Sequence, residues 1–128
     1  MKRKKKSPLQ KAQKKLWELT RQIVFKKYGK DCYTCPKKNL EGVNCQGGHV
    51  PWPASTLSTF CKYDIRFVRP QCFDCNINKG GMGAIALERM QREKIDIEAM
   101  RTLNRETKGK PYHLDWHLAK IAEYEKLV

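Results

Sequence analysis

Apolar side chains recur every three or four positions over residues 9–28, which is the period of an amphipathic helix. Ser7 stands at the N-cap position, Pro8 follows at the first helical position, and Gln10 completes a capping box. Gly29 ends the pattern, because a glycine just past the last turn commonly terminates a helix. The sequence therefore predicts one long N-terminal helix.

Two segments in the middle of the chain have the character of short strands. Residues 43–50 predict the first strand of a hairpin, and the paired glycines inside it permit a bulge or a close backbone approach beside His49. Residues 63–68 alternate in polarity and predict the return strand. Between them, the Pro-Trp-Pro run at 51–53 breaks the first strand, and the Ser/Thr-rich residues 55–59 predict an exposed loop.

The C-terminal part of the chain has helical periodicity. A short helix is expected over residues 72–79, followed by helices over 84–94, 96–108 and 113–127, with Asp96 as the N-cap of the third. The side chains expected to face inward from the last two helices are Ile97, Met100, Leu103, Leu114, Leu118 and Ile121. A hairpin among these helices predicts an α+β fold.

Four of the six cysteines form two Cys-x-x-Cys pairs, Cys32 with Cys35 and Cys72 with Cys75. Each pair offers two thiolates on one tight turn, and two pairs complete the tetrahedron that zinc prefers. The chain between the pairs is then a loop closed by a structural zinc ion.

Cys45 and Cys61 have no partner at that spacing. We interpret them as small buried apolar residues. The alternative is that one of them replaces a zinc ligand.

Charge indicates the kind of partner. The chain carries 27 Lys and Arg against 13 Asp and Glu, a net charge of +14; its first fifteen residues hold eight of these bases and no acid, which leaves the remainder at +6. Such a net positive charge favours the binding of polyanions, above all nucleic acid. The predicted DNA contacts of the basic arm, which we expect to order only on phosphate, are Lys2, Arg3, Lys4, Lys5 and Lys6. The bases of the N-terminal helix either follow phosphates or form a solvated face.

The basic start is not followed by an apolar run, and no segment approaches membrane-spanning length. We therefore expect an intracellular protein without a membrane partner. In a reducing compartment, metal binding explains the cysteines better than disulfides do.

Hydrolysis of a phosphodiester needs a base for the attacking water, a cation beside the leaving oxygen and donors around the developing charge. His49, flanked by glycines inside the zinc loop, is the candidate base, with a packing histidine as the alternative. Asn76 directly follows the last paired cysteine and could offer its carbonyl oxygen to Mg²⁺ or Mn²⁺. Asp64 is the candidate carboxylate ligand, and the alternative is an ion pair with Arg66 or Arg69.

Other charged side chains have weaker assignments. Lys79 and Arg66 are expected to hold phosphate, although each could be a solvated charge. His113 and His117 lie four apart on a predicted helix and could bind a metal together. Without a companion motif, we favour capping or surface roles for both.

The ordered set of these motifs resembles a known family. The motifs are Cys32-x-x-Cys35, Gly48-His49, Gln71-Cys72, Cys75-Asn76 with Lys79, and the C-terminal EYEKL at 123–127. Over about residues 30–127 the chain resembles the Rap/NinG recombination proteins of lambdoid phages, which have an HNH, ββα-metal fold. Phage endonuclease VII, a related zinc-supported fold, also follows its last zinc cysteine with a metal-binding Asn.

The resemblance implies a structure-selective DNA endonuclease that cuts branched recombination intermediates, such as Holliday junctions and D-loops. It implies a structural zinc, a separate catalytic Mg²⁺ or Mn²⁺, and a zinc-supported HNH-like core over residues 30–128 behind an arm and helix at 1–29. A phage-infected bacterium is then the expected setting, with other phage recombination proteins as further partners. A homodimer would suit the two cuts that a four-way junction requires.

Two departures from the HNH pattern keep other functions open. The residue before the base is usually acidic, whereas here it is Gly48, and the middle Asn of the pattern falls near Phe67. A zinc module that binds DNA without cutting it is therefore the second hypothesis. A protein-binding zinc knuckle is the third, and the basic body of the chain argues against it. The presence of both His49 and Asn76 favours the enzyme, because a binding module needs neither.

Overall fold

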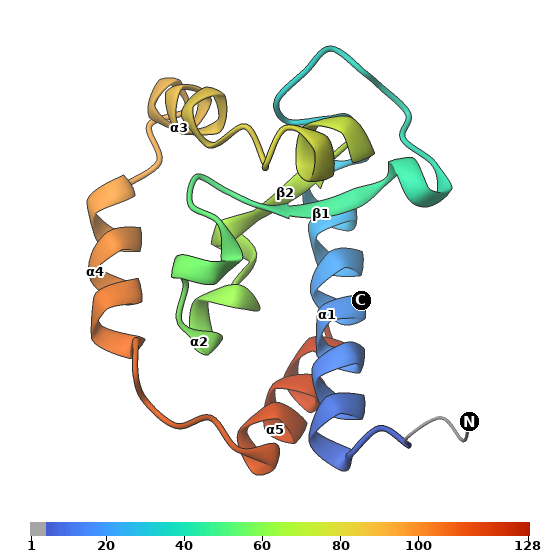
Figure 1. Ribbon diagram of the computed structural model, residues 1–128, viewed down its shortest axis with the longest axis vertical. Coiled ribbons are helices and arrows are strands. Elements are labelled where there is room, and N and C mark those ends of the chain that lie inside the picture. The colour runs from blue at the N-terminus through green and yellow to red at the C-terminus, as the bar shows by residue number, and fades with distance from the viewer. Residues whose placement is uncertain (1–4) are drawn as a thin grey trace.

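The computed structural model describes residues 5–128, so Lys2, Arg3 and Lys4 of the predicted DNA-binding arm lie outside the described residues. Within that range the fold is α+β, as predicted. The α-helices are α1 (Pro8–Tyr28), α2 (Thr59–Lys62), α3 (Gly83–Arg92), α4 (Ile97–Thr107) and α5 (Leu114–Glu125), and the strands are β1 (Gln46–His49) and β2 (Val68–Gln71). In Figure 1, α1, α5, α4 and α3 surround the two strands and α2.

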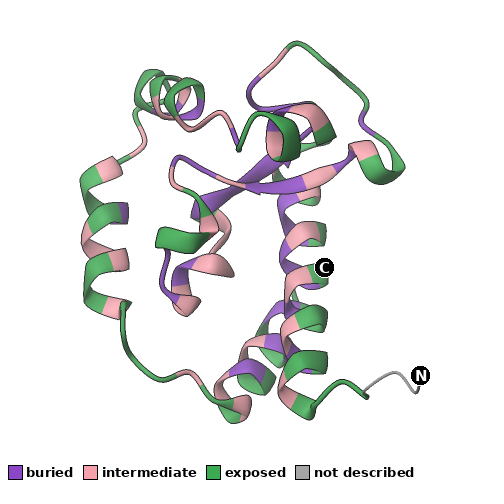
Figure 2. Cartoon of the chain, viewed as in Figure 1, coloured by how far each residue is buried: buried purple, intermediate pink, exposed green. Residues whose placement is uncertain are grey.

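The N-terminal helix is confirmed together with its predicted caps. Ser7 Oγ accepts a hydrogen bond from the backbone N–H of Gln10 at 3.1 Å, and Gln10 Oε1 accepts one from the N–H of Ser7 at 2.9 Å. The buried side chains of α1 form a hydrophobic cluster with Ile121 and Tyr124 of α5. The first and last helices of the described chain therefore share one core, whose buried faces Figure 2 shows in purple.

The two strands pair antiparallel, with Gln46 opposite Gln71 and His49 opposite Val68. The first strand lies inside the predicted segment 43–50. The predicted return strand is wrong over most of its length, because residues 65–67 form a 3₁₀ helix (η3, Ile65–Phe67) and the strand begins only at Val68. The side chain of Asp64 starts this helix by accepting a hydrogen bond from the N–H of Arg66 at 3.0 Å.

The predicted exposed loop at 55–59 also differs from the structure. A short 3₁₀ helix, η2 (Ala54–Thr56), precedes α2, while Leu57 and Ser58 are buried. Ser58 Oγ accepts a hydrogen bond from the N–H of Cys61 at 3.0 Å and thereby caps α2. The Ser/Thr-rich composition thus marks a helix start rather than a solvated loop.

The predicted helical turn after Cys72 is present as a π-helical turn, η4 (Asp74–Asn78). Its wide pitch appears in the hydrogen bond from the N–H of Lys79 to the carbonyl of Asp74, five residues back, at 2.9 Å. Such turns are rare and are frequent at functional sites. This one carries Cys75 and Asn76 on successive positions.

The last three helices match their predicted spans to within a few residues, and Asp96 caps α4 through a 2.9 Å hydrogen bond from Ala99 N–H. Two predictions for α5 are wrong. Leu118, expected inward, is exposed. His117, for which we predict a capping or surface role, is completely buried, and its Nδ1 donates to the carbonyl of His113 at 2.8 Å. His113 occupies the N-cap position and is exposed, without a capping hydrogen bond from its side chain.

Among the described helices, none combines the length and apolar character needed to cross a bilayer.

Candidate functional site

The two Cys-x-x-Cys pairs meet in space although they are far apart in the chain. The sulfur atoms of Cys32, Cys35, Cys72 and Cys75 all lie within 4.8 Å of one another, and Cys35 Sγ is 3.7 Å from Cys72 Sγ. Zinc–sulfur bonds of about 2.3 Å at a tetrahedral centre place sulfur atoms about 3.8 Å apart. These four cysteines could therefore hold a zinc ion.

Burial and hydrogen bonding act in opposite directions on these thiols. Burial raises the pKa of the Cys32 thiol, but hydrogen bonds from the backbone N–H groups of Cys72 and Thr34 outweigh it and lower that pKa to about 6. Burial and the neighbouring sulfurs raise the pKa of Cys75 to about 12. Burial thus opposes ionisation of Cys75, and a bound zinc ion would offset this by favouring its thiolate.

The remaining cysteines are buried, as predicted, and neither belongs to the group of four. Cys45 packs against that group in an apolar cluster that includes Leu40. Cys61 lies in the core beside Thr107 and is completely buried.

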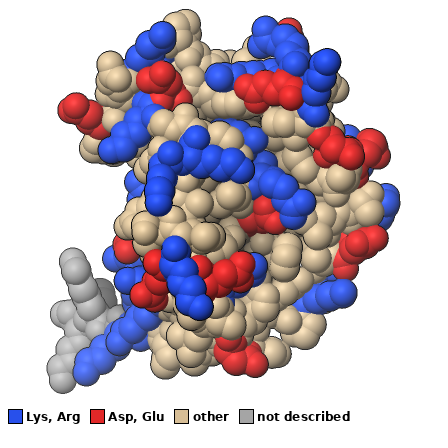
Figure 3. Space-filling view, turned by 180° about the vertical axis from the view of Figure 1, so that it is seen from behind, with Lys and Arg blue, Asp and Glu red and all other residues tan. Residues whose placement is uncertain are grey.

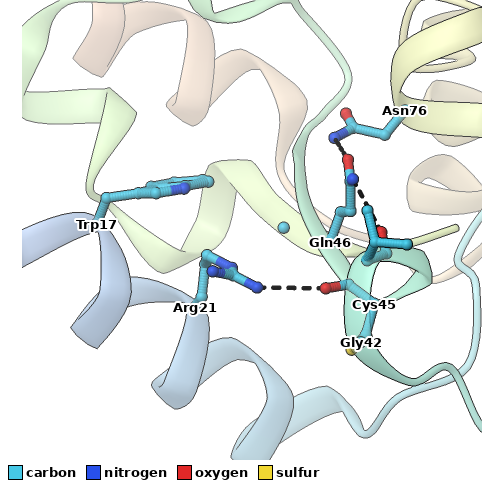
Figure 4. A pocket seen from close by; sticks show the side chains of 8 residues that line it. Trp17, Arg21, Gly42, Cys45, Gln46 and Asn76 are labelled. Atoms are coloured by element: carbon cyan, nitrogen blue, oxygen red, sulfur yellow. Dashed lines mark hydrogen bonds between the residues drawn. The ribbon is translucent and has the colours of Figure 1, made fainter. Parts of the chain in front are cut away.

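A pocket of about 320 Å³ lies beside the cysteine cluster, between α1, β1 and η4. Its lining residues are Trp17, Arg21, Gly42, Val43, Cys45, Gln46, Gly47 and Asn76. The guanidinium of Arg21 is held at its wall by a 3.2 Å hydrogen bond from Nη2 to the carbonyl of Cys45 (Figure 4). Among residues 5–128, no acidic side chain lines this pocket, so its charge favours an anion.

Two amide groups in this pocket orient each other. Gln46 Nε2 donates to the carbonyl of Val43 at 2.9 Å, and Gln46 Oε1 accepts from Asn76 Nδ2 at 2.8 Å. Because a carbonyl only accepts, the first bond fixes which way the amide of Gln46 faces, and the second then fixes Asn76. Asn76 Oδ1 points away from Gln46 in Figure 4 and accepts no hydrogen bond from residues 5–128. It is free for a water molecule or a cation.

His49 is held on two sides. Its Nε2 lies 2.9 Å from the carbonyl of Lys62, so Nε2 carries the proton and Nδ1 is left as an acceptor. Its ring stacks on the indole of Trp17, with centroids 4.9 Å apart. Burial lowers the pKa of His49 below its usual 6.5, more than the bond to Lys62 raises it. The imidazole is therefore neutral at pH 7 and has one free basic nitrogen.

The structure links His49 and Asn76 without placing them in one pocket. Gln46, which binds Asn76, begins β1, and His49 ends it, so about 10 Å of strand separates the two positions. Trp17 lines the pocket and also stacks on His49. The imidazole therefore lies beside the pocket, against one of its walls.

Gly48 is glycine because Gln71 fills the space beside it. A Cβ at residue 48 would collide with Oε1 of Gln71, whose Nε2 donates to Thr34 Oγ1 at 3.0 Å and to the carbonyl of Gly81 at 2.8 Å. The carboxamide of Gln71 thus occupies the place where an acidic side chain before His49 would begin. Its Oε1 is buried and has no hydrogen-bond partner among the described residues.

The predicted carboxylate ligand is bound to an arginine. Asp64 Oδ1 accepts from Nε of Arg66 at 2.9 Å, and Asp64 Oδ2 accepts from Nη2 of Arg66 at 2.7 Å. This is the ion pair that the alternative interpretation of Asp64 predicted. A cation at Asp64 would have to displace Arg66.

Both residues predicted to contact phosphate, Arg66 and Lys79, form ion pairs with carboxylates. Arg66 pairs with Asp64. Lys79, which directly follows η4 and is largely exposed, has its Nζ 3.3 Å from Oδ2 of Asp74. Figure 3 shows Lys and Arg side chains over much of the face seen from behind, with acidic side chains among them. The basic charge is therefore distributed rather than gathered at a single residue pair.

Sequence reasoning did not identify Trp17, Arg21 and Gln46 as site residues. Trp17 belongs to the apolar pattern of the N-terminal helix and Arg21 to its basic side chains, and both line the pocket. Only the glycine at position 47 hinted at this packing, since a Cβ there would meet Trp17 and Arg21 at 3.0–3.4 Å.

Comparison of this chain with models of known protein families, with curated proteins and with solved structures finds no match.

Proposed function

We propose that this protein is a metal-dependent DNA endonuclease in which His49 is the general base and the four-cysteine group holds a structural zinc. The observation that carries the proposal is the state of His49, whose imidazole is neutral, fixed by Lys62 and Trp17, and free at Nδ1. A general base requires such a free basic nitrogen.

The zinc has a structural role in this proposal. It joins the first cysteine turn to η4, and η4 in turn carries Asn76 into the pocket. The backbone also joins the first cysteine turn to β2, which leads into η4, through a hydrogen bond from Tyr33 N–H to the carbonyl of Pro70 at 2.8 Å. Zinc would thus fix the position of η4, and with it Asn76, in the pocket.

In this proposal the DNA backbone enters the pocket as an anion. Arg21 supplies a cationic donor there, and the basic body of the chain supplies the long-range attraction. Trp17 lines the pocket and also stacks on His49, and we propose that the DNA strand passes from the pocket along this indole to Nδ1. His49 then takes a proton from the attacking water.

The catalytic cation is the least complete part of the site. Asn76 Oδ1 is a suitable oxygen donor for Mg²⁺ or Mn²⁺, but no carboxylate accompanies it in the pocket within residues 5–128. This donor set fits a cation that arrives with DNA phosphates rather than one held by the chain alone. Such a cation would offset the charge on the leaving oxygen.

Branched recombination intermediates are the proposed substrates, on the strength of the resemblance to the Rap/NinG proteins. The HNH-like core, the phage setting, further recombination partners and a homodimer belong to the same hypothesis. The antiparallel strands followed by a helical turn with Asn76 after Cys75 support it.

One observation favours a DNA-binding module without nuclease activity. Within residues 5–128, neither predicted carboxylate position offers a free ligand to a cation, since Gln71 fills the space beside Gly48 and Arg66 binds Asp64. Binding through Arg21 and the basic surface would not need them.

Cleavage of labelled four-way junctions and linear duplexes, in Mg²⁺, Mn²⁺ or EDTA, decides between the two functions. We expect junction cleavage with either metal, none in EDTA, and a loss of about 10²- to 10⁴-fold in His49→Ala. His113→Ala is the matched control, because His113 is exposed on another element. Tight junction binding without cleavage in any metal would establish the binding module instead.

A further inference from the structure

Three exposed apolar residues belong to the segments that border the pocket. Val43 is 74% exposed, Ile77 55% and Phe73 37%. Val43 lines the pocket, Phe73 directly precedes η4, and Ile77 follows Asn76 within η4. We call these three residues the apolar rim. Exposed apolar groups that gather beside a polar pocket are typical of a binding surface.

The two halves of the apolar rim are fixed to each other. Phe73 N–H donates to Asn44 Oδ1 at 2.9 Å, which joins the 3₁₀ helix η1 (Gly42–Asn44) to the segment that leads into η4. Gln46 adds a second link, because it binds both the carbonyl of Val43 and the side chain of Asn76. The segments that carry the rim are therefore held together before a ligand binds, which lowers the cost of ordering their backbone on binding.

We propose that the apolar rim binds unstacked nucleobases at a branch point of DNA. This inference rests on the proposed function and assigns the residues that recognise its substrate. In a continuous duplex the faces of the bases are covered by stacking, whereas at a branch some of them are open. Apolar side chains inserted at open base steps are an established way in which proteins hold distorted DNA.

Charge around the rim supports DNA as its occupant. Arg21 lies in the same pocket as Val43, and Lys79, which pairs with Asp74 and is 54% exposed, follows η4 directly, so cationic groups stand on the same segments as the apolar side chains. A second copy of this chain would bring the same positive charge to the same place. Three side chains are also far fewer than a stable dimer interface of about 800 Å² per partner provides.

The test measures binding in EDTA, where no cleavage intervenes, to a four-way junction with 2-aminopurine at the branch and to a linear duplex of the same sequence. We expect Val43→Ser and Ile77→Ser each to weaken junction binding by about tenfold and to reduce the change in 2-aminopurine fluorescence. Linear-duplex affinity should stay unchanged. Ile77→Leu should bind junctions as the wild type does, because an apolar contact is kept.

Leu118→Ser is the matched control, because Leu118 is 52% exposed on α5, outside the pocket. Rim variants that bind junctions as tightly as this control would overturn the inference and leave the nuclease proposal standing. An equal loss on junction and linear DNA, or a change in sedimentation that shows self-association through the rim, would overturn it as well. A wild-type protein that binds neither DNA would refute the proposed function itself.

Discussion

The imidazole of His49 lies flat against the indole of Trp17, with ring centroids 4.9 Å apart and 20° between the ring planes. This stack joins the N-terminal helix to the end of β1. The stack and the hydrogen bond from Nε2 to the carbonyl of Lys62 fix the orientation of the imidazole. They also shield the ring partly from water. The position and the basicity of His49 therefore depend on a residue far away in the sequence.

Cleavage should consequently persist into mildly acidic solution. A general base works unprotonated, and burial lowers the pKa of His49 below 6.5, so the rate should fall only as the pH drops through that lowered pKa. Trp17→Ala exposes the ring, so its pKa should rise toward 6.5 and the acid limb should move to higher pH. Single-turnover rates against pH measure this. Trp17→Phe, which keeps an aromatic face, serves as the control, and an acid limb that does not move in Trp17→Ala would show that the stack is only structural.

The four-cysteine group should bind one zinc per chain, and removal of the metal should unfold the pocket and the strands beside it. Metal analysis and circular dichroism before and after chelation test this. Cys32→Ser should lose zinc, whereas Cys45→Ser and Cys61→Ser should keep it, since their sulfurs lie outside the group. Zinc loss in either of these two variants would mean that the ligand set is different.

The orientation of Asn76 should control the metal requirement for cleavage. Asn76→Ala should cut poorly and need more cation, with partial rescue at high Mn²⁺. Gln46→Ala leaves the oxygen of Asn76 in place but frees its amide to turn, so we expect a smaller loss, about 10- to 100-fold. Asn78→Ala is the control in the same turn, because its Nδ2 binds only Asp74. Equal metal curves for all three variants would exclude Asn76 as a ligand.

Asp64→Asn should leave cleavage unchanged at the wild-type metal concentration. Both carboxylate oxygens of Asp64 bind Arg66, whose side chain is 53% exposed, so loss of the ion pair costs about 1 kcal/mol of unfolding free energy. Thermal unfolding and cleavage rates measured on the same sample separate the two effects. A rise in the metal concentration needed for cleavage would restore Asp64 as a cation ligand.

Deletion of residues 1–6 should weaken the salt dependence of DNA binding. Each phosphate contact contributes roughly 0.9 to the slope of log affinity against log salt, so the five basic residues of the arm contribute up to about 4.5. Affinity measured across a salt series tests this. The matched variant replaces Lys108 and Lys110, exposed at the far end of α4, with Ala. An unchanged slope in the deletion would mean that the arm does not touch phosphate.

The elements that the sequence predicted correctly depend on neighbours within a few positions. The capping box of Ser7 and Gln10 is formed by residues three apart, and the cap at Asp96 likewise. The cysteine pairs predict a metal site from the sequence because the two cysteines of each pair lie on one local turn. Hydrogen bonds and steric limits at this range depend on residues that are close together in the sequence, so the sequence predicts them directly.

The predicted return strand failed because its alternating pattern has a different origin. Tyr63 and Ile65 pack against the cluster between α1 and α5, whereas Phe67 enters the cluster beneath α3 and α4. The alternation of apolar and polar residues therefore arises because side chains on the two sides of this turn enter two separate cores. It does not arise from the two faces of a pleated strand. His117 is a similar case, since its burial depends on Tyr63 and Trp116 closing around it.

The sequence by itself determined the α+β composition, the boundaries of α1 and the choice of the four cysteines, because caps, periodicity and ligand spacing are local properties. Only the tertiary structure decided that Trp17 and Arg21 line the pocket, that Gln46 orients Asn76, and that Arg66 binds Asp64. These pairings follow from how α1, β1 and η4 pack around the cysteine group. Packing depends on the complementarity of whole surfaces, which no local pattern of residues encodes.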